Sequence, residues 1–142
     1  MSFQPGTGKV GNPGFEGRKK IVRHRYSFAK HGGAVGAITL DGPAIPSGAI
    51  VTDCVIRVVD AATSGGAATV SVGVESATDV RAAATLATAP ALSTTGAKRS
   101  AVLTATTAPL VTTVARDVVA TVAVAALTAG TFDVITEYFE VA

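Results

Sequence analysis

The chain has few of the residues from which most catalytic and metal sites are built. Its 142 residues include no tryptophan, one cysteine, one methionine and two histidines. The single cysteine, Cys54, excludes a disulfide framework and a cysteine-ligated metal cluster. We expect Cys54 to be a small core residue.

Long apolar runs are also missing. No run approaches the roughly 18 consecutive apolar residues that span a bilayer, so neither a transmembrane helix nor a membrane partner is predicted. The N-terminus lacks the apolar segment of a secretory signal, and we expect synthesis in a cytoplasm.

Aromatic residues are scarce, at 5%, and the 48% of hydrophobic residues is mostly alanine and valine. The length predicts a single domain. Small side chains each bury little apolar area, so the core of this domain gains little from each of them. The mean hydropathy of +0.45 is nevertheless high. We therefore expect further apolar surface to be buried between subunits of a homo-oligomer.

Charge is distributed unevenly along the chain. Residues 1–30 contain seven basic residues and one acid, a formal charge of +6. Residues 31–142 contain five basic residues and nine acids, a formal charge of −4. The overall charge of +2 is too small to indicate nucleic-acid binding by itself.

The first segment is rich in glycine and proline, which oppose both helix and strand interiors. It also carries Phe3 and Phe15, which are costly in a free tail. We predict that residues 1–19 form an extended arm that orders on a partner surface. A frayed terminus without function is the alternative.

Beyond the arm, apolar residues recur at every second position, as is typical of half-buried strands. In the first strand, Val22, His24 and Tyr26 are expected to face the core, and Arg23 and Arg25 the outside. The segments expected to form strands are residues 20–28, 35–40, 49–60, 70–74, 100–104, 110–114, 118–124 and 132–139, with turns at 63–66 and 127–130.

One helix is predicted, over residues 76–87, because Ser76 and Asp79 resemble a weak capping box. The many short strands predict an all-β fold. We expect residues 20–142 to form a single antiparallel β-sandwich, jelly-roll-like, with one short helix and an extended N-terminal arm.

Candidate chemistry is sparse. Residues 6–11 match G-x-G-x-x-G but lack the flanking strand and helix that a phosphate site needs. His24 is expected to be a satisfied strand histidine and His31 a turn histidine, because zinc needs three or four converging ligands. Asp133 and Glu137 are expected on a solvated or interface face rather than as a glycosidase pair. We predict no catalytic residue, no cofactor and no metal.

The strongest charge signal is a basic cluster that runs from the arm into the first strand. Nucleic-acid binding is one interpretation, but Tyr26 and Phe28 are expected in the core and could not stack on bases. A basic face that meets an acidic partner is the second, and a charged edge that prevents aggregation is the third. We favour the second, with these candidate partner-binding residues: Phe3, Phe15, Arg18, Lys19, Lys20, Arg23 and Arg25.

Four segments resemble those of capsid decoration or minor head proteins of tailed bacteriophages. They are Tyr26–Leu40, Ile45–Val51, Thr63–Val70 and Leu127–Gly130. The likeness extends over about residues 22–141 and leaves out the arm. It implies a β-rich structural virion protein, often trimeric, that binds the major capsid protein on the outside of the lattice and is not an enzyme.

Two alternatives remain open. A tail, connector or fibre component would share the same β-rich composition, and copy number per virion separates it from a decoration protein. A carbohydrate- or cell-surface-binding sandwich is the other, although sugar sites usually expose aromatic side chains, which are few here.

Overall fold

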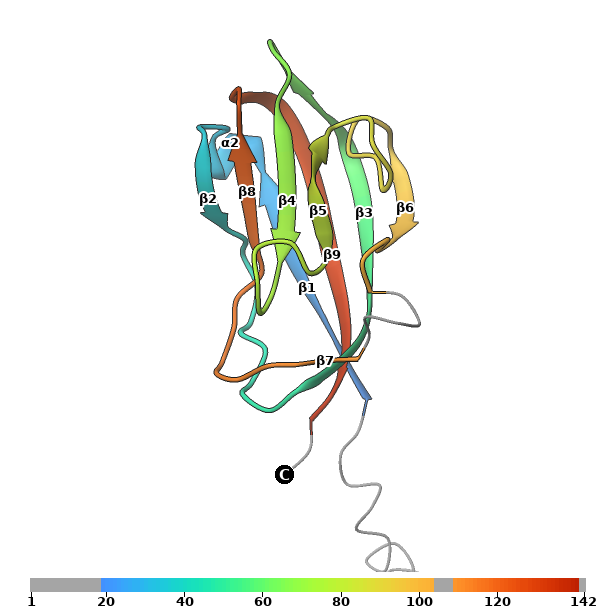
Figure 1. Cartoon of the computed structure of the whole chain (residues 1–142). Coiled ribbons are helices and arrows are strands. Elements are labelled where there is room, and N and C mark those ends of the chain that lie inside the picture. The colour runs from blue at the N-terminus through green and yellow to red at the C-terminus, as the bar shows by residue number, and fades with distance from the viewer. Residues whose placement is uncertain (1–18, 104–108, 141–142) are drawn as a thin grey trace, which may run out of the picture.

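Two antiparallel sheets packed face to face form the molecule (Figure 1). The computed structural model describes residues 19–103 and 109–140. The first sheet, sheet A, has the strand order β1-β9-β3-β6, with the short β7 also paired to β3. Its strands are β1 (Lys19–Ser27), β9 (Leu127–Phe139), β3 (Ile50–Ser64), β6 (Gly96–Arg99) and β7 (Leu110–Val111).

Sheet B has the order β2-β8-β4-β5 and lies in front of sheet A in Figure 1. Its strands are β2 (Gly36–Thr39), β8 (Val119–Ala123), β4 (Thr69–Gly73) and β5 (Arg81–Thr85). Within the described residues, no helix is long and apolar enough to cross a membrane.

The strand order is that of a jelly roll. The first four strands alternate between the two sheets, and the last strands return to lie beside the first, so that β9 pairs β1 and β8 pairs β2. This nesting of late strands between early ones produces the two Greek keys of the fold. The expectation of an antiparallel, jelly-roll-like sandwich is confirmed.

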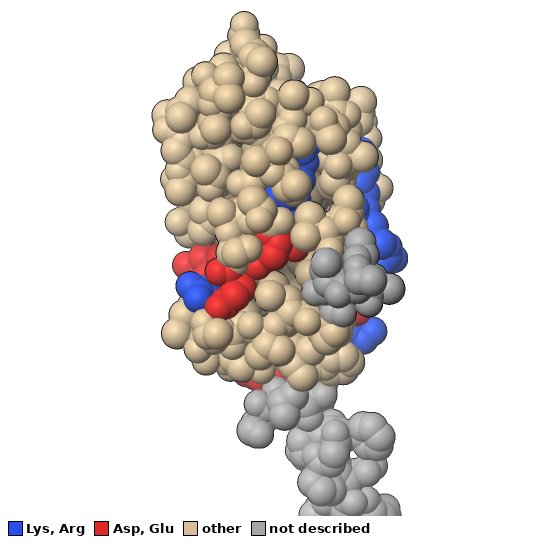
Figure 2. Space-filling view, in the orientation of Figure 1, with Lys and Arg blue, Asp and Glu red and all other residues tan. Residues whose placement is uncertain are grey.

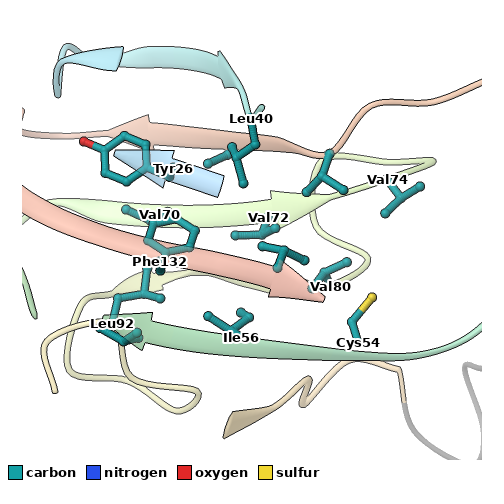
Figure 3. Close-up of a cluster of buried hydrophobic side chains, with 14 of the residues drawn as sticks. Tyr26, Leu40, Cys54, Ile56, Val70, Val72, Val74, Val80, Leu92 and Phe132 are labelled. Carbon is teal, nitrogen blue, oxygen red and sulfur yellow. The ribbon is translucent and has the colours of Figure 1, made fainter. Parts of the chain in front are cut away.

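The core lies between the sheets and follows the period-two pattern of the sequence. Tyr26 of β1 stacks on Phe132 of β9 with 5.1 Å between ring centroids, and the Tyr26 hydroxyl donates to the Gly32 carbonyl at 2.7 Å. Valines of β4 cover this pair from the opposite sheet (Figure 3). Cys54 is fully buried, as expected, and burial raises the pKa of its thiol to about 12.

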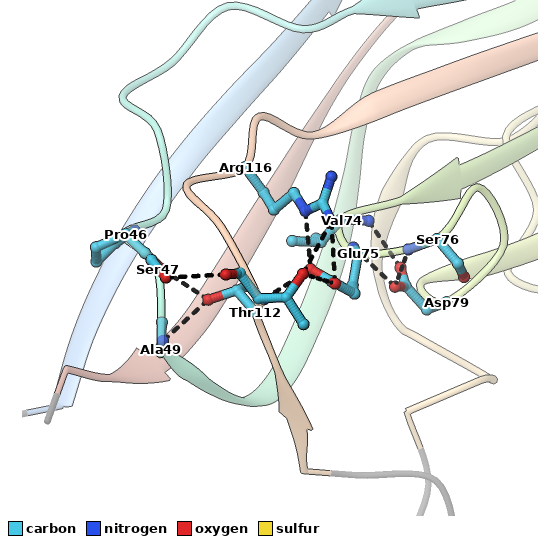
Figure 4. A network of polar contacts seen from close by, with 10 residues as sticks. Pro46, Ser47, Ala49, Val74, Glu75, Ser76, Asp79, Thr112 and Arg116 are labelled. Atoms are coloured by element: carbon cyan, nitrogen blue, oxygen red, sulfur yellow. Dashed lines mark hydrogen bonds and ion pairs between the residues drawn. The ribbon is translucent and has the colours of Figure 1, made fainter.

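The helix expected over residues 76–87 is wrong. This stretch forms turns followed by β5, because the Asp79 carboxylate accepts backbone N–H groups of Val74, Glu75 and Ser76 at 2.7–2.9 Å (Figure 4). The capping box thus closes a loop and starts no helix. Among the described residues, the one helix is α2 (Phe28–His31), which contains His31.

Other boundaries also differ from expectation. The turn predicted at residues 127–130 is wrong, since they belong to β9 and the chain turns before them, at Val124, where φ is 72°. The edge strand expected over residues 100–104 is wrong, since residues 100–103 form no strand and residue 104 lies outside the described residues; the edge strand found nearby is β6, which ends at Arg99. The expected arm of residues 1–19 lies outside the described residues except for Lys19, which begins β1.

Candidate docking surface

The predicted partner-binding residues divide into two groups. Phe3, Phe15 and Arg18 lie outside the described residues. The other four, Lys19, Lys20, Arg23 and Arg25, lie on β1.

Alternation along β1 places Lys19, Arg23 and Arg25 on the outer face of sheet A, together with Ile21. Lys20 belongs to the opposite face, and its ammonium pairs with Glu140 at 2.5 Å. Three of the four described candidates therefore share one face.

Asp133 of β9 lies at the centre of this outer face. Its carboxylate accepts two hydrogen bonds from the Arg25 guanidinium, at 2.6 and 2.9 Å, and lies 3.9 Å from the Arg57 guanidinium. The Asp133 side chain has 0% exposure, although the sequence pattern predicted a solvated or interface position. Three arginines enclose it because Arg25, Asp133 and Arg57 are neighbours across β1, β9 and β3, and Arg23 lies two residues away on β1.

The electrostatics of the cluster favour full ionisation. The hydrogen bonds from Arg25 lower the pKa of Asp133 more than burial raises it, and charges of Arg23 and Arg57 add to the lowering. The same contacts raise the pKa of Arg25. One carboxylate neutralises one arginine, so the cluster keeps a net positive charge at neutral pH.

A second row of residues lies beside this cluster. Register across the sheet pairs Arg23 with Ile135, Ile135 with Val55 and Val55 with Arg99. The two central side chains are half-buried and the two arginines are exposed. The row therefore presents a short apolar floor with an arginine at each end.

We call Arg23, Arg25, Arg57, Arg99, Val55 and Ile135 together the arginine face. Some of its charges are already paired: Arg99 pairs with Asp53, and Lys19 on its rim lies 3.6 Å from Glu137. No hydrogen bond or ion pair to Arg23 is found among the described residues. Arg23 and Arg57 are thus the charges best placed to meet a partner.

Sequence reasoning missed Arg57, Arg99 and the role of Asp133. The outward position of Arg57 could have been read from the alternation along β3. Its meeting with Arg25 depends on both strands flanking β9, and no local pattern reveals that arrangement.

The outer face of sheet B contrasts with the arginine face. Its register joins Ala37 to Thr121 and Thr121 to Ser71, all small and uncharged. Figure 2, which looks onto this side of the molecule, shows a largely uncharged upper area with a small basic patch, above a band in which acidic side chains lie beside a basic one. The charged docking candidates therefore belong to sheet A.

A polar network fixes the loops at the end of sheet B. The Glu75 carboxylate accepts two hydrogen bonds from the Arg116 guanidinium, at 2.8 and 3.0 Å (Figure 4). These bonds, with those from Thr113, lower the pKa of Glu75 to about 2. Glu75 and Arg116 thus satisfy each other's charge and hydrogen-bonding groups, so the network holds the loops together and is not a site for a partner.

The histidines do not form a metal site. No group of three His, Cys, Asp or Glu side chains able to hold a metal ion occurs in residues 19–103 and 109–140. His24 is buried on β1 as predicted. The nearby backbone of Pro43 favours its protonated form, but neither ring nitrogen has a hydrogen-bond partner of normal geometry among the described residues. The His31 ring contacts Ser27 through Nδ1 at 3.1 Å and stacks on Tyr26.

Comparison with known proteins gives similarity in structure alone. No family model and no curated protein sequence matches the chain. A chain from the capsid asymmetric unit of cyanophage Pam1 is 23% identical, with a TM-score of 0.63 over 88% of this chain and 86% of that one. A chain from the acid-stable capsid of Helicobacter pylori bacteriophage KHP30 is 20% identical, with a TM-score of 0.59 over 87% and 89%. At these identities the matches show that the chain shares the fold of both.

Proposed function

We propose that this chain is a structural protein of a tailed-phage capsid, and specifically a decoration protein that binds the outside of the major capsid lattice as an oligomer. The observation that carries the proposal is the fold match to chains from two phage capsids, which extends over nearly the whole length of both partners. A match of this extent means that the whole domain, and not a single motif, has the same fold. The proposed role is mechanical and needs no catalytic residue.

The arginine face is the surface that we assign to capsid docking. Arg23 and Arg57 carry positive charge beside a half-buried apolar floor, which suits an acidic capsid surface with an exposed apolar side chain. Complementary charge of this kind accelerates encounter and fixes orientation. The pairing of Arg25 with Asp133 holds the centre of the face in place before docking.

The arm and the uncharged face complete the proposal. In this proposal the predicted arm, residues 1–19 with Phe3 and Phe15, docks on the lattice. The outer face of sheet B is largely uncharged and carries small residues such as Ala37 and Thr121, which permits close approach of a second copy in an oligomer, a trimer in our proposal.

Purified virions provide the direct test. Antibody labelling in negative-stain images, with mass-spectrometric copy number, should find many copies over the head surface. A few copies at one vertex or on the tail would make the chain a connector or tail component. Absence from particles would end the capsid proposal.

A charge-reversal variant tests the docking surface. The double variant Arg23→Glu, Arg57→Glu should be incorporated into particles at least roughly tenfold less than wild type, because two exposed attractive charges become repulsive. The control variant Lys30→Glu reverses one charge on α2, outside the arginine face, where Lys30 pairs with Asp41 at 2.6 Å, and it should be incorporated normally. An equal loss of incorporation in both variants would show that the arginine face is not the docking surface. A chain lacking residues 1–18 tests the arm in the same assay.

A further inference from the structure

The edge of sheet A at β1 is open over half its length. Among the strands of residues 19–103 and 109–140, β1 pairs with β9 on one side and has no neighbouring strand on the other. Asp41 covers the far half of that free side, since its backbone exchanges hydrogen bonds of 2.9 and 3.0 Å with the backbone of Arg25. Toward the start of β1, no hydrogen bond from another described residue reaches the outward backbone groups of Ile21 or the outward N–H of Arg23.

The backbone groups at this open edge can be assigned from the pairing. In an antiparallel ladder, successive residues direct their N–H and C=O groups to opposite sides. Arg25 directs its groups away from β9, toward Asp41, so Arg23 and Ile21 do the same. Gly42 lies against the Arg23 carbonyl, where a Cβ atom would approach it to 2.5 Å. The N–H and C=O of Ile21 and the N–H of Arg23 remain accessible.

The side chains at this edge point to a particular occupant. Ile21 is 64% exposed and lies between Lys19 and Arg23 on the same face of the strand. A second copy of β1 paired antiparallel about Ile21 would place Lys19 opposite Arg23, and like charges directly opposite are destabilising. Residues 1–18 contain two basic residues and a single acid, Glu16, so they are no better suited.

We propose that β1 accepts an extended acidic segment of a partner protein as an added strand of sheet A, between Lys19 and Arg23. Backbone hydrogen bonds to Ile21 and Arg23 supply the pairing, as in other cases of strand addition. An acidic side chain opposite Arg23 and an apolar side chain opposite Ile21 supply most of the selectivity. A second acidic side chain opposite Lys19, which lies 3.6 Å from Glu137, adds to it. This inference does not depend on the capsid proposal, since it follows from the edge alone.

Two peptides test the selectivity on the full chain. The probe is acetyl-Thr-Glu-Thr-Val-Thr-Glu-Thr-amide, and the control has Lys in place of both Glu. In ¹⁵N NMR titrations, the Glu peptide should shift the amides of residues 19–23 and slow hydrogen exchange at Ile21 and Arg23. The Lys peptide should bind at least roughly tenfold more weakly, because two attractive cross-strand pairs become repulsive. Equal binding of the two peptides would overturn the proposal.

A matched pair of variants tests the backbone pairing. Ile21→Pro removes the outward N–H, and an edge strand tolerates proline where its N–H faces solvent. Ile21→Thr removes the same apolar side chain but keeps the N–H. Peptide affinity should fall at least roughly tenfold more in Ile21→Pro than in Ile21→Thr, with the same β signature by circular dichroism for both. Equal affinities would mean that the edge does not pair.

Amide hydrogen exchange in the chain without peptide shows whether something other than a partner segment covers the edge. If Ile21 and Arg23 amides are already protected without peptide, the chain's own residues cover the edge. If protection rises with protein concentration, a second copy covers it. Either result overturns the proposal, and neither bears on whether the chain is found in virions.

Discussion

Arg81 is the largest fully buried side chain among the described residues, and its substitution gives the sharpest stability prediction. Its guanidinium donates to the carbonyls of Pro90 at 2.9 Å, Thr85 at 2.7 Å, Thr88 at 2.9 Å and Ala84 at 3.2 Å, and also to that of Val70. The hydrogen bond to the Val70 carbonyl lies where the pairing of β4 with β5 shifts register, between Val70 and Val72. The side chain thus joins the sheet to the loop after β5 without any carboxylate.

The magnitude follows from which carbonyls lose their donor. Thr85 and Thr88 are exposed, so water can replace the guanidinium there, whereas Val70 and Pro90 are buried. An unsatisfied buried carbonyl costs about 1–3 kcal/mol, so two of them cost about 2–6 kcal/mol. Arg81→Met also removes the desolvation of an ionised group, which offsets part of this loss. We expect Arg81→Met to lower the free energy of unfolding by about 2–4 kcal/mol.

Urea unfolding followed by circular dichroism measures this loss. For a slope of about 1–3 kcal/mol per molar urea, the midpoint should fall by roughly 0.7–4 M. Arg81→Lys keeps the charge but loses the planar five-donor array, so it should be destabilised at least as much. Arg99→Met, at an exposed arginine, is the control and should change little. A normal midpoint for Arg81→Lys would show that charge alone suffices and refute the reasoning.

Two further predictions concern buried titratable groups. Burial lowers the pKa of His24 below its usual 6.5, while Pro43 and Asp117 oppose the shift. The unfolded chain therefore binds the extra proton more readily than the folded chain does. The free energy of unfolding should consequently fall as the pH drops below 6.5. His24→Phe should flatten the urea midpoint between about pH 7 and pH 5 without loss at pH 7.5, since neither ring nitrogen has a hydrogen-bond partner of normal geometry among the described residues; an unchanged slope would contradict this. Cys54, with a pKa near 12, should resist a thiol reagent at pH 8 in the folded chain and react once urea unfolds it; rapid labelling without urea would contradict its burial.

The sequence predicts the strands best where apolar residues alternate strictly. Tyr26 and Phe132 occupy such positions, and both lie in the core as expected. The pattern fails over residues 76–87, where alanines fit a helix and an edge strand equally well. The structure of this stretch is decided by hydrogen bonds from the side chains of Asp79 and Arg81 to the backbone. The periodicity of the sequence does not reveal which backbone groups these side chains bind.

The candidate surface was predictable only in part, for a related reason. The outward position of Arg23 and Arg25 follows from alternation along β1. The buried partner of Arg25 lies 108 residues away, and Arg57 reaches the same carboxylate from β3. Such a cluster exists only because the jelly-roll topology returns the last strand between β1 and β3.

That same topology explains how a cluster of arginines can be both stable and available for binding. Without Asp133, Arg23 and Arg25 would repel each other along β1, and both would repel Arg57 of β3 across the intervening β9. With it, Arg25 is held by two hydrogen bonds while Arg23 and Arg57 stay exposed, so the face is ordered before a partner arrives. Removing the carboxylate should therefore weaken the fold and the docking together, whereas reversing Arg23 should weaken docking alone. A variant Asp133→Asn with an unchanged free energy of unfolding would show that the carboxylate does not hold this cluster together.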